Sequence, residues 1–348
     1  MKKLLVIFSL LLIVLLSLSF SKESLRSIYS RPSSQWPKPT IDDGVQWKEL
    51  GILPGSPLDL ANDSIKNVVE LGKLLFFDTR LSSSGKISCA TCHQPALSWT
   101  DGKERSVGHE GAMNKRNAPS LQNVWFYKRL FWDGRAKDLQ DQAFAPINSE
   151  SEMHSDMPDV MQKIRRVKEY STLFKKAFGN EAIDPDRMAE AIATFEKTIV
   201  SRKSRFDEFL DSNKKALTNE EIKGLDLFRT KARCMNCHNG PMFTDNLFHR
   251  TGLTENDEGL YKVTHQEEDR KKFKTPSLRD IMFTGPWMHD GSIRDMVMIL
   301  ELYKKGPPGA DKLLKPLALS SKEMTALRSF LNAISSPPLE FKTPDPIQ

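Results

Sequence analysis

Two cysteine–histidine motifs carry the residues of this sequence that are best suited to chemistry. Each has two cysteines three positions apart and a histidine directly after the second: Cys89, Cys92 and His93 in the first motif, and Cys234, Cys237 and His238 in the second. At this spacing two thiols can form thioethers with one haem while the histidine binds its iron. The chain has four cysteines, so none remains for a disulfide or a four-cysteine zinc site. The sequence therefore predicts two covalent haem c groups, with His93 and His238 as proximal iron ligands.

The first residues of the chain predict export. Lys2 and Lys3 precede an apolar run from Leu4 to Leu18, and small residues follow. This order is typical of a secretory signal peptide, which we place at residues 1–20, with an uncleaved membrane anchor as the alternative. Covalent haem c is normally attached outside the cytoplasm, so we expect a periplasmic protein. Loss of the two lysines lowers the formal net charge from +6 to +4, and without a clustered basic stripe we expect no nucleic-acid partner.

Helical patterns dominate the rest of the chain. Residues 21–60 are rich in serine, proline and glycine, and we interpret them as an irregular lead-in on the protein surface. Capping residues followed by apolar side chains at helical spacing predict helices that begin near Asn62, Asp156, Asp184, Thr218 and Ser320. Alternating strand patterns are scarce. The predicted fold is all-α and loop-rich, with two cytochrome c-like domains at residues 61–200 and 201–348, each around one haem.

The two halves of the chain repeat each other beyond the cysteine motifs. A Pro-Ser-Leu triplet begins at Pro119 and again at Pro276, and an Asp-Gly pair follows fourteen residues later in both halves. In this register Pro146 corresponds to Tyr303. A tyrosine oxygen can bind the second face of a haem iron, whereas proline offers no ligand atom. We therefore expect a six-coordinate second haem and an open first haem, which peroxide or dioxygen chemistry needs.

Two polar side chains lie close to Pro146 in the sequence. They are Gln142 and Glu152. A buried carboxyl near an open iron could move the proton that cleavage of an O–O bond requires. These two residues are therefore our candidates for a peroxide site on the first haem.

The second half of the sequence offers more than one candidate for the second axial ligand of its haem iron. Tyr303 shares a helical face with Met296, so Met296 is the rival ligand and plain helix packing is the other interpretation of Tyr303. His289 corresponds to Trp132 in the repeat, and we expect it to hydrogen-bond a haem propionate. No partner pattern surrounds His249, and the same holds for His154 in the first half.

Six segments together resemble the bacterial di-haem cytochrome c peroxidases and their MauG-type relatives. They are Cys89–His93, Ser106–His109, Phe131–Arg135, Glu152–Met153, Thr275–Arg279 and Met288–Ser292. The resemblance runs from about Leu71 to Lys305. It implies an enzyme that reduces hydrogen peroxide at the N-terminal haem. Electrons would come from a small cytochrome or cupredoxin through the C-terminal haem.

The resemblance also implies roles for particular residues. Trp132 would lie between the haems as the electron relay, and Glu152 with Gln142 would serve the peroxide site. Three residues match positions that bind a calcium ion at the domain interface: Asn117, Thr284 and Pro286. The oligomeric state is left open, with a homodimer as one option.

Two residues depart from a single subfamily pattern. His109 lies where the peroxidases carry a distal histidine that blocks the resting N-terminal haem, so it is a candidate iron ligand. Tyr303 falls where those enzymes carry methionine and where MauG-type enzymes carry tyrosine. Phenolate is a harder ligand than thioether sulfur and favours ferric iron, so we expect a lower potential at the second haem. The glycines around His109 further suggest a loop that moves easily.

Three functions follow from these patterns. A hydrogen peroxide reductase is the preferred one. The first alternative is a MauG-type oxidase that modifies residues of a partner protein, which Tyr303 favours and His109 disfavours. The second is a non-catalytic di-haem electron-transfer protein, which Pro146 and Glu152 disfavour.

Overall fold

The computed structural model describes residues 23–253 and 256–347. The predicted signal peptide, residues 1–20, lies outside the described residues. Within the described part of the chain, the search for a helix long and apolar enough to cross a bilayer finds none.

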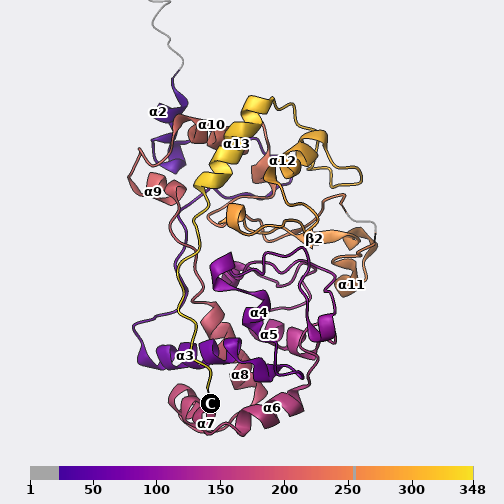
Figure 1. Ribbon diagram of the computed structural model, residues 1–348. Coiled ribbons are helices and arrows are strands. Elements are labelled where there is room, and N and C mark those ends of the chain that lie inside the picture. Colours follow the sequence, from indigo (N-terminus) through magenta and orange to yellow (C-terminus); the bar gives the residue numbers. More distant parts are fainter. Residues whose placement is uncertain (1–22, 254–255, 348) are drawn as a thin grey trace, which may run out of the picture.

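The described residues are mostly helical. The lower part of the molecule in Figure 1 contains α3 (Asp63–Phe77), α4 (Cys89–Cys92), α5 (Leu139–Asn148), α6 (Met157–Arg165), α7 (Lys168–Phe178) and α8 (Pro185–Glu196). The upper part contains α2 (Leu25–Tyr29), α9 (Arg205–Asp211), α10 (Asn219–Arg229), α11 (Tyr261–Thr264), α12 (Met296–Lys305) and α13 (Ser321–Ala333). One feature departs from the all-α expectation. A short antiparallel pair, β1 (Phe248–Arg250) and β2 (Lys272–Lys274), places Phe248 opposite Lys274.

Capping side chains set where the longer helices begin, as the sequence predicts. Each cap accepts a hydrogen bond from a backbone N–H that has no partner within its helix. The helix starts predicted at Asn62, Asp156, Asp184, Thr218 and Ser320 are confirmed. The last two are full capping boxes, in which a glutamate three residues later returns the bond to the cap.

Two helix pairs form the same crossing in the two halves of the molecule. In the first half α3 packs on α8, and a Cβ added at Gly72 would lie 1.8 Å from the carbonyl oxygen of Ala191. In the second half α10 packs on α13, and a Cβ at Gly224 would lie 2.0 Å from the carbonyl oxygen of Ala326. Only glycine permits so close an approach of two backbones. Each pair belongs to its own cluster of buried apolar side chains.

The N-terminal segment is more than a surface lead-in. Tyr29, Trp36 and Leu50 are buried in the second apolar cluster. The guanidinium of Arg229 lies over the rings of Tyr29 and Trp36 and pairs with Glu49. The serine- and proline-rich composition does not indicate that this segment contributes to the core. A few large aromatic side chains are nevertheless enough to anchor an irregular segment.

The C-terminal tail also crosses the boundary expected at residue 201. After α13 the chain runs back along the molecule, and its end lies beside α7 and α8 (Figure 1). Phe341 and Ile347 pack against the apolar cluster of the first half. The tail therefore ties the two halves together.

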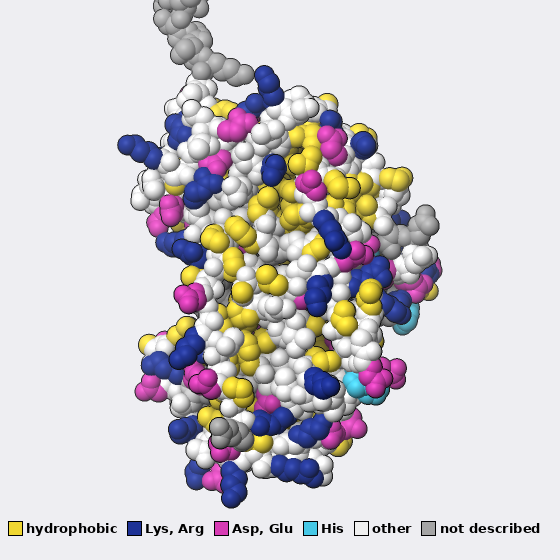
Figure 2. Space-filling model, viewed as in Figure 1, with side chains coloured by type: hydrophobic (Ala, Val, Ile, Leu, Met, Phe, Trp, Pro, Cys, Tyr) yellow, Lys and Arg dark blue, Asp and Glu magenta, His cyan; other side chains and the backbone are white. Residues whose placement is uncertain are grey.

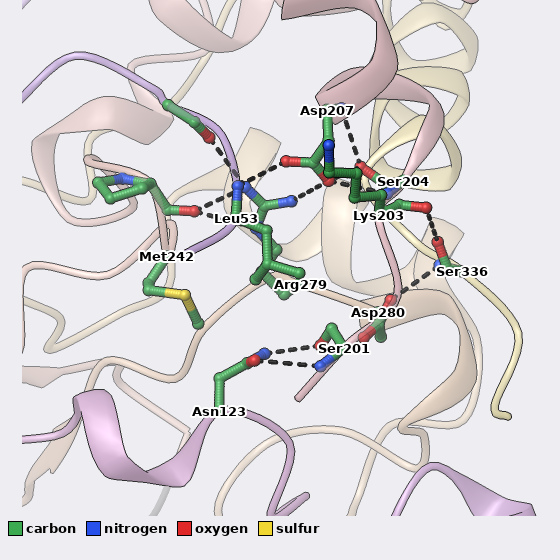
Figure 3. A network of polar contacts seen from close by, with 12 residues as sticks. Leu53, Asn123, Ser201, Lys203, Ser204, Asp207, Met242, Arg279, Asp280 and Ser336 are labelled. Carbon is green, nitrogen blue, oxygen red and sulfur yellow. Dashed lines mark hydrogen bonds and ion pairs between the residues drawn. The ribbon is translucent and has the colours of Figure 1, made fainter. Parts of the chain in front are cut away.

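A buried polar network lies where the chain passes from the first half to the second (Figure 3). Arg279 pairs with Asp207 at 2.6 Å, and their side chains are 1% and 0% exposed. Nearby, the side-chain amide of Asn123 donates to Ser201 Oγ at 2.6 Å and accepts from the Ser201 backbone N–H at 3.1 Å. Burial raises the pKa of Asp207, but the charge of Arg279 and the hydrogen bonds from Arg279 and Ser204 together hold that pKa below its usual value.

Charged side chains are mixed over the surface seen in Figure 2. Lysine and arginine are interspersed there with aspartate and glutamate. This face therefore carries no broad field of a single sign.

Candidate functional site

Each cysteine motif lines its own cavity. The first cavity, of about 930 Å³, is lined by Cys89, Cys92 and His93. The second, of about 260 Å³, is lined by Cys234, Cys237 and His238. The structure thus brings together the three residues of each motif in the wall of one cavity, as covalent haem attachment requires.

Both motif histidines are oriented by a backbone carbonyl. Nδ1 of His93 lies 3.0 Å from the carbonyl oxygen of Trp99, and Nδ1 of His238 lies 2.9 Å from that of Phe243. Such a bond places the proton on Nδ1 and leaves Nε2 free to bind a metal. Burial lowers the pKa of both imidazoles, which favours the neutral form that metal binding needs.

Buried polar atoms that lack a partner also fit a bound haem. Among the described residues, Nε of Arg105 and Oε2 of Glu196 are buried without a hydrogen bond, and both residues line the first cavity. Oγ1 of Thr251, which lines the second cavity, is likewise buried without a hydrogen bond. Unpaired buried polar atoms are costly, so they indicate a missing polar partner. Arg105 would hold a propionate carboxylate.

The residues that the sequence pairs as Pro146 and Tyr303 line different cavities. Pro146, on α5, lines the first cavity, and Tyr303, on α12, lines the second. Burial raises the pKa of the Tyr303 phenol. Met296, the rival ligand, lines the same cavity as Tyr303 and is 4% exposed. Both candidate ligands of the second iron, Tyr303 and Met296, therefore line the second cavity.

The predicted acid–base pair lies in the first cavity. Gln142, on α5, and Glu152, in the loop after it, both line that space. Burial raises the pKa of the Glu152 carboxyl, while the charge of Arg135 opposes the shift. A raised pKa favours the protonated form of the carboxyl, which a proton donor needs.

Two aromatic side chains line both cavities. Trp132 donates its indole N–H to the carbonyl oxygen of Asn117 at 3.0 Å. The ring of His289 is 4% exposed and stacks on Phe273 at 3.9 Å. The internal repeat pairs these two residues, and in the structure they lie at the shared wall of the cavities.

His109 does not line the first cavity. Its ring stacks on His154 with 4.5 Å between the centroids, and its Nδ1 lies 3.3 Å from Ser83 Oγ. The loop that carries His109 is also held more firmly than its flanking glycines suggest. The His109 backbone N–H donates to the carbonyl oxygen of Glu152 at 2.9 Å, and a Cβ on Gly108 would lie 2.1 Å from a neighbouring carbonyl oxygen. Sequence analysis did not predict the contact of His154 with His109, because stacking partners that are distant in the chain leave no spacing pattern.

His249 is a second residue that sequence reasoning left unassigned. It lines the second cavity, with Nε2 2.7 Å from Asp245 and Nδ1 3.2 Å from Asp311. Burial lowers the pKa of His249, but its interactions with Asp245, Asp311 and Cys237 together raise it to about 12. Cys237, Asp245 and His249 offer ligand atoms within 4.8 Å of one another, yet Cys237 belongs to the haem motif. His249 is therefore held in the wall of the second cavity by the carboxylates of Asp245 and Asp311.

The residues matched to a calcium site lie near the shared wall. Asn117 lines both cavities, and Thr284 and Pro286 line the second. The amide nitrogen of Asn117 donates to backbone carbonyl oxygens, which fixes the orientation of its side chain. Calcium binding here stays a prediction.

Comparison with known proteins agrees with this geometry. A family model described as di-haem cytochrome c peroxidase matches residues 66–215. The methylamine utilization protein MauG of Methylophilus methylotrophus is 37% identical over 295 residues, which cover 83% of this chain and 88% of that protein. The chain belongs to the di-haem cytochrome c peroxidase family. A cytochrome c551 peroxidase of Nitrosomonas europaea is 35% identical over 311 residues, 86% of this chain and 91% of that one.

Solved structures of relatives share the fold. The crystal structure of a MauG-like protein associated with microbial copper homeostasis has a TM-score of 0.74 and 28% identity, and covers 83% of this chain and 95% of that one. The di-haem peroxidase BthA of Burkholderia thailandensis, at 22% identity, has a TM-score of 0.69 and supports the fold alone. Family membership makes this chain an oxidoreductase and implies two haem c groups.

Proposed function

We propose that this protein reduces hydrogen peroxide to water at the first haem, with electrons from a small cytochrome or cupredoxin relayed through the second. The observation that carries the proposal is the difference between the cavities. Pro146 and Glu152, whose pKa is raised by burial, line the first cavity, whereas Tyr303 lines the second. An iron that must bind peroxide needs a free face, and one that only passes electrons does not.

The side chains of the first cavity supply the proton chemistry. A haem held by Cys89, Cys92 and His93 would supply the electrons that cleave the O–O bond. Glu152 would take a proton from one peroxide oxygen and return it to the other, which leaves as water. The amide of Gln142 hydrogen-bonds the bound peroxide and orients it. Overall, one peroxide, two electrons and two protons give two waters.

Trp132 is the proposed electron relay between the cavities. Its indole lines both, and its N–H donates to a fixed carbonyl oxygen, which supports a single ring orientation. Tyr303 as the axial ligand would favour ferric iron at the second haem. Each haem would then sit in its own cytochrome c-like domain.

We further propose a cellular location, a bound calcium ion and an oligomeric state for this protein. The haem c motifs and the predicted signal peptide support a periplasmic location. Asn117, Thr284 and Pro286 would hold a calcium ion near the shared wall, and a homodimer remains one option. None of these is needed for the chemistry at Glu152.

The proposed reaction is tested by turnover with a reduced donor. Mixing the protein with hydrogen peroxide and an excess of reduced cytochrome c should oxidise two donor molecules per peroxide. The matched control is a Cys89→Ala, Cys92→Ala variant, which should keep the second haem and lose turnover. A wild-type protein that carries both haems but oxidises no donor would contradict peroxide reduction.

A MauG-type oxidation of a partner protein is the second candidate. Tyr303 favours it, and the position of His109 outside the cavity removes the main objection to it. It would use the same first haem and Trp132, but take electrons from residues of the partner instead of a small redox protein. Absence of donor turnover together with a fast peroxide reaction would favour this candidate.

The position of His109 predicts how the oxidised protein reacts. Because its ring is held by His154 and Ser83 away from the cavity, the oxidised wild type should react with peroxide without prior reduction. In stopped-flow mixing, His109→Gly should therefore react at about the wild-type rate, as should the exposed control His265→Gly. A slow wild type beside a fast His109→Gly variant would show that His109 gates the haem.

A further inference from the structure

The carbonyl that orients His93 belongs to a residue in an unfavourable backbone conformation. Trp99 has φ +61°, and Ser98 before it has φ +54°. Left-handed backbone is uncommon for a bulky side chain and persists only where the surroundings hold it. The orientation of His93 therefore depends on what packs against the indole of Trp99.

Three phenylalanines hold the indole. The ring centroids of Phe76 and Phe195 lie 5.9 and 6.0 Å from it, on the helices α3 and α8 that form the core of the first half. The third ring, Phe341, lies nearest, at 5.0 Å and close to perpendicular. It comes from the C-terminal tail, more than two hundred residues away in the sequence.

The second half contains the same arrangement with a local fourth ring. There the carbonyl bonded to His238 belongs to Phe243, which also has a left-handed backbone, with φ +52°. Phe228 and Phe330 occupy the places of Phe76 and Phe195 in the helix-pair repeat, at 5.9 and 6.3 Å. The remaining ring is Phe206 of α9, at 5.8 Å. The first half lacks a local counterpart in this cluster, and Phe341 takes that place.

The tail is fixed at this position by contacts on both sides of the ring. Phe341 stacks on Phe77 at 5.7 Å with an interplanar angle of 11°, and the ammonium of Lys73 lies 5.1 Å from its centroid. Further along, the guanidinium of Arg80 donates to the carbonyl oxygen of Ile347 at 2.5 Å. These contacts hold the returning tail against α3 (Figure 1).

We infer that Phe341 is a positioning residue for His93, acting through the indole and carbonyl of Trp99. The C-terminal tail thereby completes the proximal support of the first haem. This inference rests on the proposed attachment of a haem at the first motif. A hydrogen bond at Nδ1 raises the basicity of a histidine ligand, so its loosening changes the bond that His93 makes to iron.

The inference predicts a change confined to the first haem. Phe341→Ala removes the nearest ring from Trp99 and should weaken the bond from His93 Nδ1 to the carbonyl. The first haem should then show a lower iron–histidine stretching frequency in resonance Raman spectra of the reduced protein, and a higher reduction potential. The second haem should keep its wild-type values.

Matched variants separate positioning from general damage to the tail. Phe341→Tyr keeps the ring and should restore wild-type spectra, and Leu339→Ala alters a tail side chain that is 57% exposed and should change nothing. If Phe341→Ala does not fold, Phe341→Leu provides the same test with a smaller change in volume. Wild-type frequency and potential in a folded Phe341→Ala protein would overturn the inference, as would an equal shift in Leu339→Ala. A wild type without a haem on His93 would instead overturn the proposed function.

Discussion

Replacing Glu152 with glutamine is expected to slow the reaction with hydrogen peroxide by about 10²–10⁴-fold, the usual loss for a general acid–base group. The amide keeps the size and burial of the carboxyl but cannot carry a proton between the peroxide oxygens. Because Glu152 lies in the loop and not in a cysteine motif, the absorption spectra of both haems should hardly change. The rate is measured by stopped-flow mixing of the oxidised protein with peroxide.

Glu150→Gln is the matched control for this variant. Glu150 lies two residues earlier in the same loop, is exposed, and is absent from the lining of the first cavity. It should react at the wild-type rate. A wild-type rate in Glu152→Gln would remove Glu152 from the mechanism.

Replacing Arg279 with alanine is expected to lower the free energy of unfolding by about 3–5 kcal/mol, the range found when one partner of a buried ion pair is removed. Asp207 would be left as a buried carboxylate whose remaining bonds come from neutral donors, the backbone N–H groups of Leu53 and Ser204 and the Ser204 hydroxyl. Arg279 also donates to carbonyl oxygens of Pro241 and Gly51, and these would lose a partner. Urea denaturation of the haem-loaded protein measures the change.

The control for this variant is a surface arginine. Arg294 has a side chain that is 73% exposed and lies 3.4 Å from Glu104. Arg294→Ala should change the free energy of unfolding by no more than about 0.5 kcal/mol, as is usual for surface substitutions. Equal stabilities of the two variants would show that the Arg279–Asp207 pair does not stabilise the fold.

Much of the site could be predicted because its residues are close in sequence or related by the repeat. The cysteine motifs fix three side chains around each cavity by local spacing alone. Aligning the two halves of the sequence pairs Trp132 with His289, and both line the shared wall. Helix starts such as Thr218 are equally visible, since a cap and its partner lie within one turn.

Other features depend on contacts between distant segments and leave no pattern in the sequence. The ring of Phe341 reaches Trp99 from the far end of the chain, and nothing in the composition of its segment indicates that contact. The stack of His109 on His154 similarly places His109 outside the cavity, although its spacing from His93 matches a ligand position. In both cases tertiary packing, and not local sequence, determines where the side chain lies.

Electron paramagnetic resonance of the resting, fully oxidised protein tests the central claim most directly, because it reports the ligands of both irons in one spectrum. We predict two ferric signals of equal spin concentration: a high-spin signal from the first haem, as expected for an iron with no second axial ligand, and a low-spin signal from the second, as expected for an iron that both His238 and Tyr303 would bind. The signal of the second haem should change in Tyr303→Phe, and that of the first should not. Two low-spin signals in the wild type would mean that both irons are closed, and would contradict the assignment of peroxide chemistry to the first cavity.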